Sequence, residues 1–411
     1  MSPVSLLPIL PIILIALVAM KLAGSALGIK PAEGSFASID GLRGYLAFFV
    51  FLHHSCLWYF LLHGYGWGHP PSYIYDHFGP TSVCVFFMIT SFLFFSKLLD
   101  ARDKGVDWLK LYVSRFLRIM PLYAATMLLM YFIVGILTHL TLREPLSVLL
   151  IKTLKWFTFI QADVNALVPT WLINAGVVWS LAFEWAFYCS LPFIGLLLKI
   201  KSSINVLVPA LGVVIFFIWA IAEFYPGGGF TRAAPFLSGM LAAILVRNSK
   251  IKKVASSPFV SALILAMVVV VLTFFSSVYS FYPLLMMTIV FIAIACGNNV
   301  FGVLTLSISR RLGQISYSIY LLHGFVLFIA FRWIWGFKKI GQLSVLQYWM
   351  VIGALAMVVV IVSSLCYRFI ERPSQDAAPG AAKKIRVWLA WPVSFMKRKP
   401  ALPSQDILRE R

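Results

Sequence analysis

The sequence predicts an all-α, polytopic integral membrane protein with about ten core transmembrane helices and one further apolar helix at the N-terminus. Apolar residues make up 61% of the 411 residues and charged residues only 12%. Several apolar runs approach twenty residues, which is the length that a helix needs to cross a bilayer. The lysines and arginines gather between these runs and in the C-terminal tail.

The formal net charge of +20 has to be interpreted through this distribution. Basic residues placed between apolar runs indicate membrane topology and contact with anionic lipid, so nucleic acid is not an expected partner. The five cysteines are scattered through apolar segments, without the spacing of a zinc site or of a disulfide framework. They are interpreted as packing residues, and no metal is expected.

Residues 4–27 form the first apolar run. No basic segment precedes it, so an extra spanning helix or an uncleaved signal-anchor is favoured over a cleaved signal. Core spans are expected near residues 42–63, 80–99, 119–138, 175–198, 204–223, 230–247, 258–275, 281–296, 314–334 and 346–369. The chain then divides into an N-terminal helix (1–37), a membrane domain (38–373) and a basic cytoplasmic tail (374–411), which either lies on anionic lipid or is disordered.

Positive charges predict the orientation of the spans. Segments rich in lysine and arginine follow the second, fourth and sixth core spans and precede the ninth, whereas the loops at 64–79, 224–229 and 276–280 have neither residue. The basic segments are therefore expected to face the cytoplasm. Lys338 and Lys339 are exceptions, and so are two lysines of the loop 139–174, which is interpreted as partly re-entrant or interfacial.

The first core span carries ionisable residues inside an apolar helix. Arg43 and His54 are eleven residues apart, so they point within about 20° of each other, while His53 is turned about 80° away. Along the axis they are about 16 Å apart. Ionisable residues in spanning helices are functional candidates by default, and this face suits a long ligand with a charged head and a reactive end. The alternative is a snorkelling Arg43 and a structural His54.

Arginines and a carboxylate mark two later spans. Arg115 and Arg118 share a helix face, and guanidinium forks suit phosphate oxygens; ordinary membrane topology is the alternative. Ser180, Glu184 and Tyr188 recur every four residues, and Glu184 is the one acid of its span. We expect His54 or an arginine as its partner, either for chemistry or as a structural ion pair.

A third polar stripe lies on the ninth core span. Ser316, Tyr320 and His323 follow one another at spacings of four and three, which places them on one helix face. They are candidates for binding an acceptor or for lining a donor channel, and interhelical hydrogen bonding alone is the alternative.

These stretches resemble, in their order, the membrane acyltransferase type 3 family, bacterial O-acyltransferases of sugars and surface polysaccharides. IDGLRG, with ten residues between its arginine and the histidine, resembles the opening helix of the family. Four later stretches agree: FFMITSFLF (86–94), RFLRIMPLY (115–123), WSLAFEWAFY (179–188) and SYSIYLLH (316–323). The resemblance ends at ERP (371–373). Thr90 and Ser91 replace the usual serine–glycine pair, which loses the backbone closeness that glycine allows.

The resemblance implies acyl transfer, expected to be acetyl transfer, from cytoplasmic acyl-coenzyme A to a hydroxyl of a carbohydrate, glycolipid or exopolysaccharide unit at the bacterial inner membrane. Acyl-coenzyme A is then a substrate, with no permanently bound cofactor. His54 would be the general base, with Glu184 orienting it or compensating its charge; a covalent acyl-histidine is the open variant. Arg43, Arg115 and Arg118 would hold the donor, and Ser180, Tyr188, Ser316, Tyr320 and His323 would contact substrate.

Two other classes of function remain open from the residues alone. A transporter or flippase would use the intramembrane arginine, histidine and glutamate as a substrate path or proton relay, although no inverted repeat is evident. A structural membrane subunit would need these residues only for assembly. The acceptor, the acyl chain length and the oligomeric state do not follow from the sequence.

Overall fold

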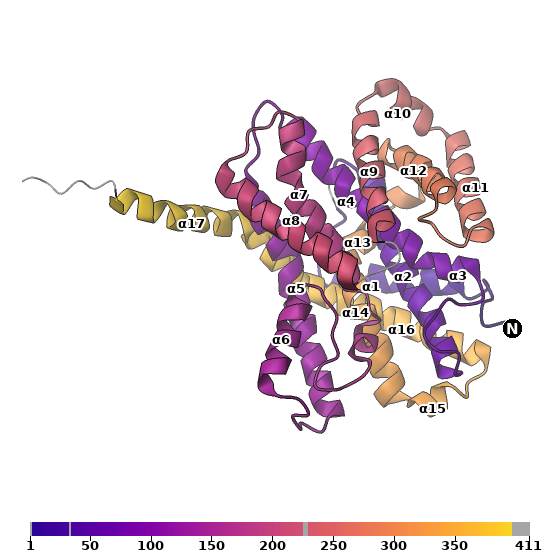
Figure 1. Ribbon diagram of the computed structural model, residues 1–411. Helices are drawn as coiled ribbons and strands as arrows, with labels where there is room; N and C mark the ends of the chain where they lie inside the picture. The colour runs from indigo at the N-terminus through magenta and orange to yellow at the C-terminus, as the bar shows by residue number, and fades with distance from the viewer. Residues whose placement is uncertain (1, 33, 225–228, 397–411) are drawn as a thin grey trace, which may run out of the picture.

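The computed structural model describes residues 2–32, 34–224 and 229–396 (Figure 1). Within these ranges every regular element is a helix, so the predicted all-α fold class is confirmed. Eight helices in this part of the chain are long and apolar enough to cross a membrane. A ninth such span results if α10 (Ser249–Ala255) and α11 (Pro258–Phe274), which meet at an angle of 72°, are taken as one broken helix.

Each predicted apolar run falls on a helix, although α9 (Gly229–Leu245) and α12 (Phe281–Ala295), with 17 and 15 residues, are short for a spanning helix. The remaining elements are α1 (Ile9–Ala26), α2 (Ala37–Leu62), α3 (Tyr73–Phe78), α4 (Pro80–Asp100), α5 (Trp108–Leu137), α6 (Leu146–Phe157), η1 (Thr170–Asn174), α7 (Trp179–Leu197), α8 (Ile204–Phe224), η2 (Val303–Thr305), α13 (Ser307–Gln314), α14 (Ser316–Ile329), η3 (Ala330–Ile334), α15 (Phe337–Ile340), α16 (Val345–Cys366), η4 (Tyr367–Glu371) and α17 (Arg372–Met396).

Local sequence signals explain where several helices begin. Ser344 and Gln347 form a capping box at the start of α16, each side chain accepting the backbone N–H of the other residue. The carboxylate of Asp107 accepts the N–H of Lys110 at the start of α5. Pro80 occupies the first turn of α4, where its missing N–H costs no hydrogen bond.

Helix α2 lies at the centre of the core, and two of its glycines allow other elements to approach its backbone. A Cβ atom at Gly41 would lie 1.9 Å from the backbone oxygen of Leu304 in η2. A Cβ atom at Gly313 of α13 would lie 1.7 Å from the backbone oxygen of Asp40, and Gly44 faces the same helix. The glycines of IDGLRG thus fix α13 and η2 against the N-terminal turns of α2.

With Thr90 and Ser91 in place of a serine–glycine pair, α4 was expected to lose a close backbone contact. A glycine of the neighbouring helix restores such a contact. Helices α4 and α9 pack together, and a Cβ atom at Gly239 of α9 would lie 2.1 Å from both the backbone oxygen of Met88 and the hydroxyl of Ser91. The glycine that permits this contact is therefore on α9 rather than on α4.

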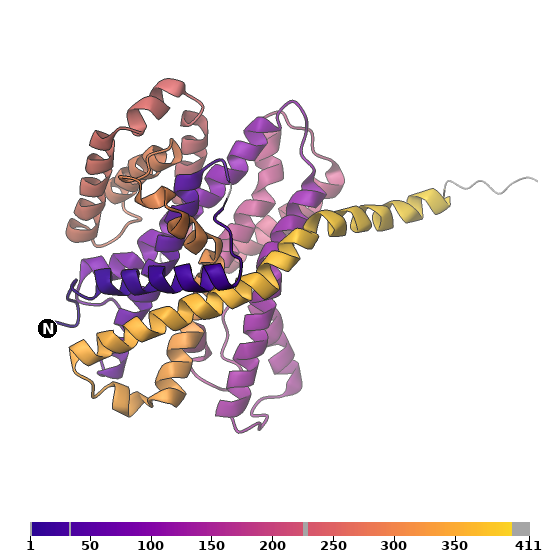
Figure 2. The ribbon, with the colours of Figure 1, turned by 180° about the vertical axis from the view of Figure 1, so that it is seen from behind.

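The N-terminal apolar run is part of the bundle. Helix α1 lies along α16 (Figure 2), burying Ile12, Ala16 and Met20, and the indole of Trp349 donates to the backbone oxygen of Pro3 at 3.1 Å. Helix α1 is also long and apolar enough to cross a membrane. Its length and its packing on α16 both fit an extra spanning helix.

The C-terminal tail begins as a helix. Helix α17 continues α16 through η4 and projects from the bundle (Figures 1 and 2). Arg386 forms an ion pair with Asp107 at the start of α5, and the hydrogen bond from Arg386 lowers the pKa of this carboxyl. Residues 397–411, with five basic residues of the tail that was expected to lie on lipid, and residues 225–228 of an expected outer loop lie outside the described residues.

The segment between α5 and α7 carries Lys152 and Lys155, the two lysines of the loop 139–174 that do not fit the orientation predicted from positive charges. Helix α6 turns an apolar face outward, with Leu150 and Leu154 more than half exposed, as an interfacial helix would. Lys152 pairs with Glu144, and the hydrogen bond from this ammonium lowers the pKa of the Glu144 carboxyl. Lys155 lies over the ring of Phe224, 5.5 Å from its centroid.

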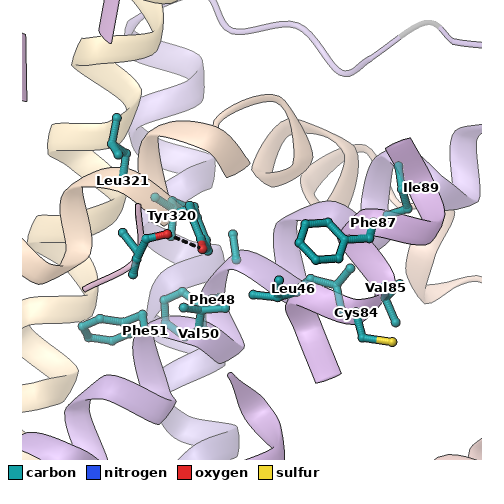
Figure 3. Close-up of a cluster of buried hydrophobic side chains, with 14 of the residues drawn as sticks. Leu46, Phe48, Val50, Phe51, Cys84, Val85, Phe87, Ile89, Tyr320 and Leu321 are labelled. Atoms are coloured by element: carbon teal, nitrogen blue, oxygen red, sulfur yellow. Dashed lines mark hydrogen bonds between the residues drawn. The ribbon is translucent and has the colours of Figure 1, made fainter. Parts of the chain in front are cut away.

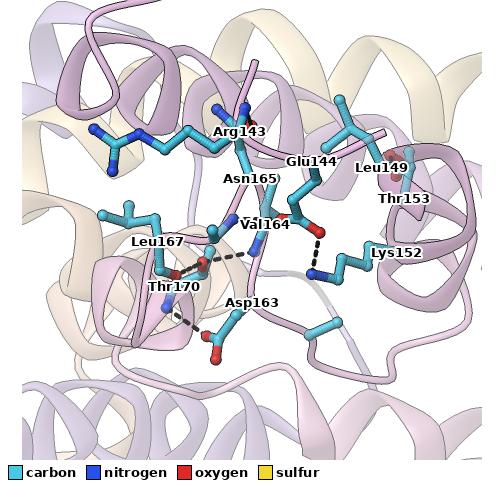
Figure 4. A network of polar contacts seen from close by, with 12 residues as sticks. Arg143, Glu144, Leu149, Lys152, Thr153, Asp163, Val164, Asn165, Leu167 and Thr170 are labelled. Carbon is cyan, nitrogen blue, oxygen red and sulfur yellow. Dashed lines mark hydrogen bonds and ion pairs between the residues drawn. The ribbon is translucent and has the colours of Figure 1, made fainter. Parts of the chain in front are cut away.

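A polar network fixes the rest of this segment (Figure 4). Asn165 accepts the N–H of Arg143 at 2.7 Å and donates to Thr138 at 2.9 Å. Asp163 accepts the N–H of Thr170 at 2.9 Å, and the hydroxyl of Thr170 accepts the N–H of Val164 at 2.9 Å. These bonds tie the start of η1 to the loop before it.

The substitution Gly239→Val tests the contact between α4 and α9. The new side chain overlaps the Met88 backbone, so we expect a loss of about 1–3 kcal/mol in stability, measured as a lower temperature of aggregation of detergent-solubilised protein. Gly212→Val in α8 is the matched control, because nothing lies within 4 Å of its Cβ position. Equal stability of the two variants would contradict the contact.

Candidate active site

A cavity opens among α2, α4, α5, α7 and α14, with about 780 Å³ of empty space counting its mouth. Eight of the ten residues selected from the sequence line it: Arg43, Arg115, Arg118, Ser180, Glu184, Tyr188, Ser316 and Tyr320. Most of the α4 lining is apolar, including Phe86 and Leu93. Five stretches that are far apart in the sequence therefore meet around one space with a charged side and an apolar side.

Three guanidinium groups and one carboxylate set the charge of this cavity. Glu184 accepts hydrogen bonds from the hydroxyls of Tyr188 (3.2 Å) and Thr90 (3.4 Å). Arg43, Arg115 and Arg118 lie close enough to interact electrostatically with it, and Arg115 lies over the ring of Phe94 at 5.0 Å. The cavity lining itself holds three cations and one anion, and guanidinium groups directed at one space suit a ligand that carries several negative charges.

This arrangement decides between the two expected partners of Glu184. Within the described residues its hydrogen-bond donors are Thr90 and Tyr188, and its charged neighbours are the arginines. His54 instead contacts the backbone oxygen of Val50 and the ring of His323. Glu184 is thus a member of the arginine cluster, and no direct contact orients His54 through it.

The two histidine candidates form a pair next to the cavity. His54 Nδ1 lies 2.9 Å from His323 Nε2, and the ring centroids are 5.0 Å apart. His323 is fully buried, and His54 keeps 9% exposure. His53, on the other face of α2, contacts the backbone oxygen of Tyr75 at 2.8 Å. The 3.6-residue period predicted that His53 and His54 point in different directions, and their separate partners confirm this.

The backbone contacts assign the protons of this pair. A carbonyl oxygen only accepts, so His323 Nδ1–H donates to Ile319 O at 3.0 Å and His54 Nδ1–H donates to Val50 O at 3.0 Å. His323 Nε2 is then an acceptor that shares the N–H of His54. His54 Nε2 carries a lone pair and has no hydrogen-bond partner among the described residues, which leaves it ready to take a proton.

Tyr320 lies between the cavity and the histidines. Its hydroxyl donates to Val177 O at 2.9 Å (Figure 3) and lies 2.7 Å from the hydroxyl of Ser180. Its ring centroid is 6.4 Å from that of His323. The polar stripe of α14 thus runs from Ser316 at the arginines, past Tyr320, to His323.

Glu371 belongs to the same charged region, although from the sequence it was only the first residue of the ERP stretch. It is 2% exposed in η4, accepts a hydrogen bond from Ser318 and interacts electrostatically with Arg118 and Arg43. The sequence held only a weak signal for it, an acid two residues beyond the predicted span 346–369 and flanked by Arg368 and Arg372. Its place beside the arginines depends on the packing of η4 against α5 and α14.

Comparison with known proteins gives one result. A family model described as an acyltransferase domain matches residues 36–368, which is most of the chain. No curated protein and no solved structure matches the chain.

The substitution Glu184→Gln tests the charge balance of the cavity. An amide keeps an acceptor for Tyr188 but removes the one carboxylate of the cavity lining, so we expect a stability loss on the order of 3 kcal/mol. Inorganic pyrophosphate should recover part of the lost stability by binding the arginines. Glu223→Gln, which removes the same charge from an exposed position in α8, is the control. A Glu184→Gln protein as stable as this control would show that the carboxylate is not needed there.

Proposed function

The chain belongs to the membrane acyltransferase type 3 family, and from this premise we propose that it transfers an acyl group, acetyl in the simplest case, from acyl-coenzyme A to a hydroxyl of a carbohydrate, glycolipid or exopolysaccharide unit. One observation carries the proposal. On α2, Arg43 lines the cavity and His54, on the same helix face, belongs to the histidine pair. On α14, Ser316 lines the cavity and His323 completes the pair, so the two helices place their groups in the same order.

The cavity is the proposed donor site. The coenzyme carries a diphosphate and a further phosphate, which match three arginine side chains that bind phosphate through two N–H groups at once. Its pantetheine arm is long and mostly uncharged, and it would pass along the apolar lining of α4 toward Tyr320. The lysine- and arginine-rich helix ends lie on this side, so we propose that the donor enters from the cytoplasm.

His54 is the proposed general base. The acceptor oxygen bonds to the thioester carbonyl carbon while its proton passes to His54 Nε2. The carbon–sulfur bond then breaks, and the leaving thiolate takes this proton, which gives an O-acyl ester and free coenzyme A. His54 Nδ1–H, shared by Val50 O and His323 Nε2, would stabilise the positive charge on the imidazolium during the transfer.

The hydroxyl of Ser180 is the proposed stabiliser of the carbonyl oxygen, positioned by the hydroxyl of Tyr320, whose own proton goes to Val177 O. The two hydroxyls lie at the inner end of the donor cavity, 2.7 Å from each other, where the thioester would reach the histidines. A hydroxyl donor positioned before the reaction stabilises the negative charge that develops on this oxygen.

The assignment of the base is tested by release of free thiol from acetyl-coenzyme A by purified protein in lipid, with a glycolipid extract as acceptor. His54→Ala should lower the rate about 10²–10⁴-fold, which is the usual contribution of a general base, with donor binding retained. His63→Ala, at an exposed position at the end of α2, is the control. Release at the wild-type rate by a folded His54→Ala protein would refute the assignment, and a transporter would release no thiol and bind no donor.

The donor site is tested by the double substitution Arg115→Ala/Arg118→Ala. Loss of two phosphate-binding groups should weaken acetyl-coenzyme A binding at least tenfold, since each charged hydrogen bond contributes about 1.5–3 kcal/mol. Binding is measured by calorimetry on protein in lipid. Arg102→Ala/Lys104→Ala removes two exposed charges from the turn after α4 and should leave the affinity unchanged. Similar affinities of both double variants would place the donor elsewhere.

A further inference from the structure

One tryptophan covers His54 on the side away from the arginines, and a second packs against the first. The ring of Trp67, in the loop after α2, stacks on His54 with centroids 5.9 Å apart and an interplanar angle of 23°. The ring of Trp171, in η1, meets Trp67 edge-on at 5.6 Å. Trp67 also contacts Trp58, one turn beyond His54 on α2, so this tryptophan corner, Trp67 and Trp171, lies beyond His54 as seen from Arg43.

The corner is held in place by packed structure. Trp58, which supports Trp67, is 1% exposed. Behind Trp171, η1 is docked on α14 immediately after His323, because a Cβ atom at Gly324 would lie 2.4 Å from the backbone carbon of Asn174. The loop network of Figure 4 holds Thr170 and thereby the start of η1. Both indoles are therefore set in a defined position relative to the histidine pair.

The indoles keep surface and hydrogen-bonding capacity for a ligand. Both tryptophans are half-buried, and within the described residues neither indole N–H donates to a protein acceptor. The loop 63–72 that carries Trp67 has no lysine or arginine. The corner thus offers aromatic faces and N–H donors without the cations that a phosphate or carboxylate would require.

This chemistry matches an uncharged sugar ring. The face of an indole carries partial negative charge, so the C–H face of a pyranose packs on it while the hydroxyls project around the rim. A ring stacked at the corner would present a hydroxyl next to His54, the group that takes the proton in the proposed reaction. A lipid or a phosphate would use only part of these features.

We propose that Trp67 and Trp171 form the acceptor subsite, which binds a neutral pyranose ring from the end of the bundle opposite the arginine cavity. The inference rests on the proposed function and deepens it. Donor and acceptor then approach His54 from opposite sides, and the acyl group crosses the bundle without either substrate doing so. The competing role for the two indoles is an aromatic belt at the membrane surface, which holds lipid rather than sugar.

The test is protection of His54 from diethyl pyrocarbonate, which modifies unprotonated imidazole nitrogens, in protein reconstituted in lipid nanodiscs. Mass spectrometry follows His54, with His69, whose side chain is 87% exposed, as internal reference. The probes are octyl β-D-glucopyranoside and 1-octanol, which share an alkyl chain and differ in the sugar. The glucoside should slow modification of His54 in the wild type several-fold, and octanol should not.

The variants assign the protection to the corner. Trp67→Ala and Trp171→Ala should lose it, Trp67→Phe should retain part of it, and Trp388→Ala, an exposed tryptophan of α17, should keep it fully. Three results would overturn the inference: no protection of the wild type, equal protection by octanol, or undiminished protection in both alanine variants. Thiol release by the wild type is scored separately, so sugar protection without thiol release would refute the acyl transfer and leave the sugar site standing.

Discussion

Placing three guanidinium groups inside an apolar helix bundle is the constraint on which the rest of the site depends. A charge in such surroundings is costly unless an opposite charge or hydrogen-bond partners accompany it. Glu184 lies among the arginines, bonded by Thr90 and Tyr188, and Glu371 approaches them from η4. Asp40 also interacts with Arg43 and Arg118. The carboxylates thus offset the arginine charges, while the cavity lining itself holds three guanidinium groups and one carboxylate toward a bound polyanion.

Glycine contacts convert this electrostatic requirement into a fixed geometry. Gly41 and Gly44, the two glycines of IDGLRG, allow η2 and α13 to pack on the backbone of α2, so the helix that carries Arg43 cannot shift relative to its neighbours. Gly239 does the same where α4 meets α9. Gly324 brings η1 against α14 beside His323. Three close approaches thus hold the donor cavity, the histidine pair and the tryptophan corner in register.

The functional groups follow one another along the bundle. Arginines are at the basic end, hydroxyls of Ser180 and Tyr320 come next, the histidine pair follows, and the two indoles close the other side. This order separates a charged substrate from an uncharged one and leaves His54 as the group that both would reach. Backbone carbonyls, rather than Glu184, define which nitrogen of His54 is free.

The sequence by itself determined the helical class, the runs that become helices and the residues that share each helix face, because both hydropathy and the 3.6-residue period are local properties. Arg43, His54 and the separate direction of His53 follow from this period alone, as do the stripes on α7 and α14. Only the tertiary structure decided which faces meet. The pairing of His54 with His323, the choice of arginines as neighbours of Glu184, and the positions of Glu371, Trp67 and Trp171 depend on how far each helix is shifted along and rotated against the next. This register is set by glycine contacts and loop bonds between residues that are far apart in the chain, so no local spacing contains it.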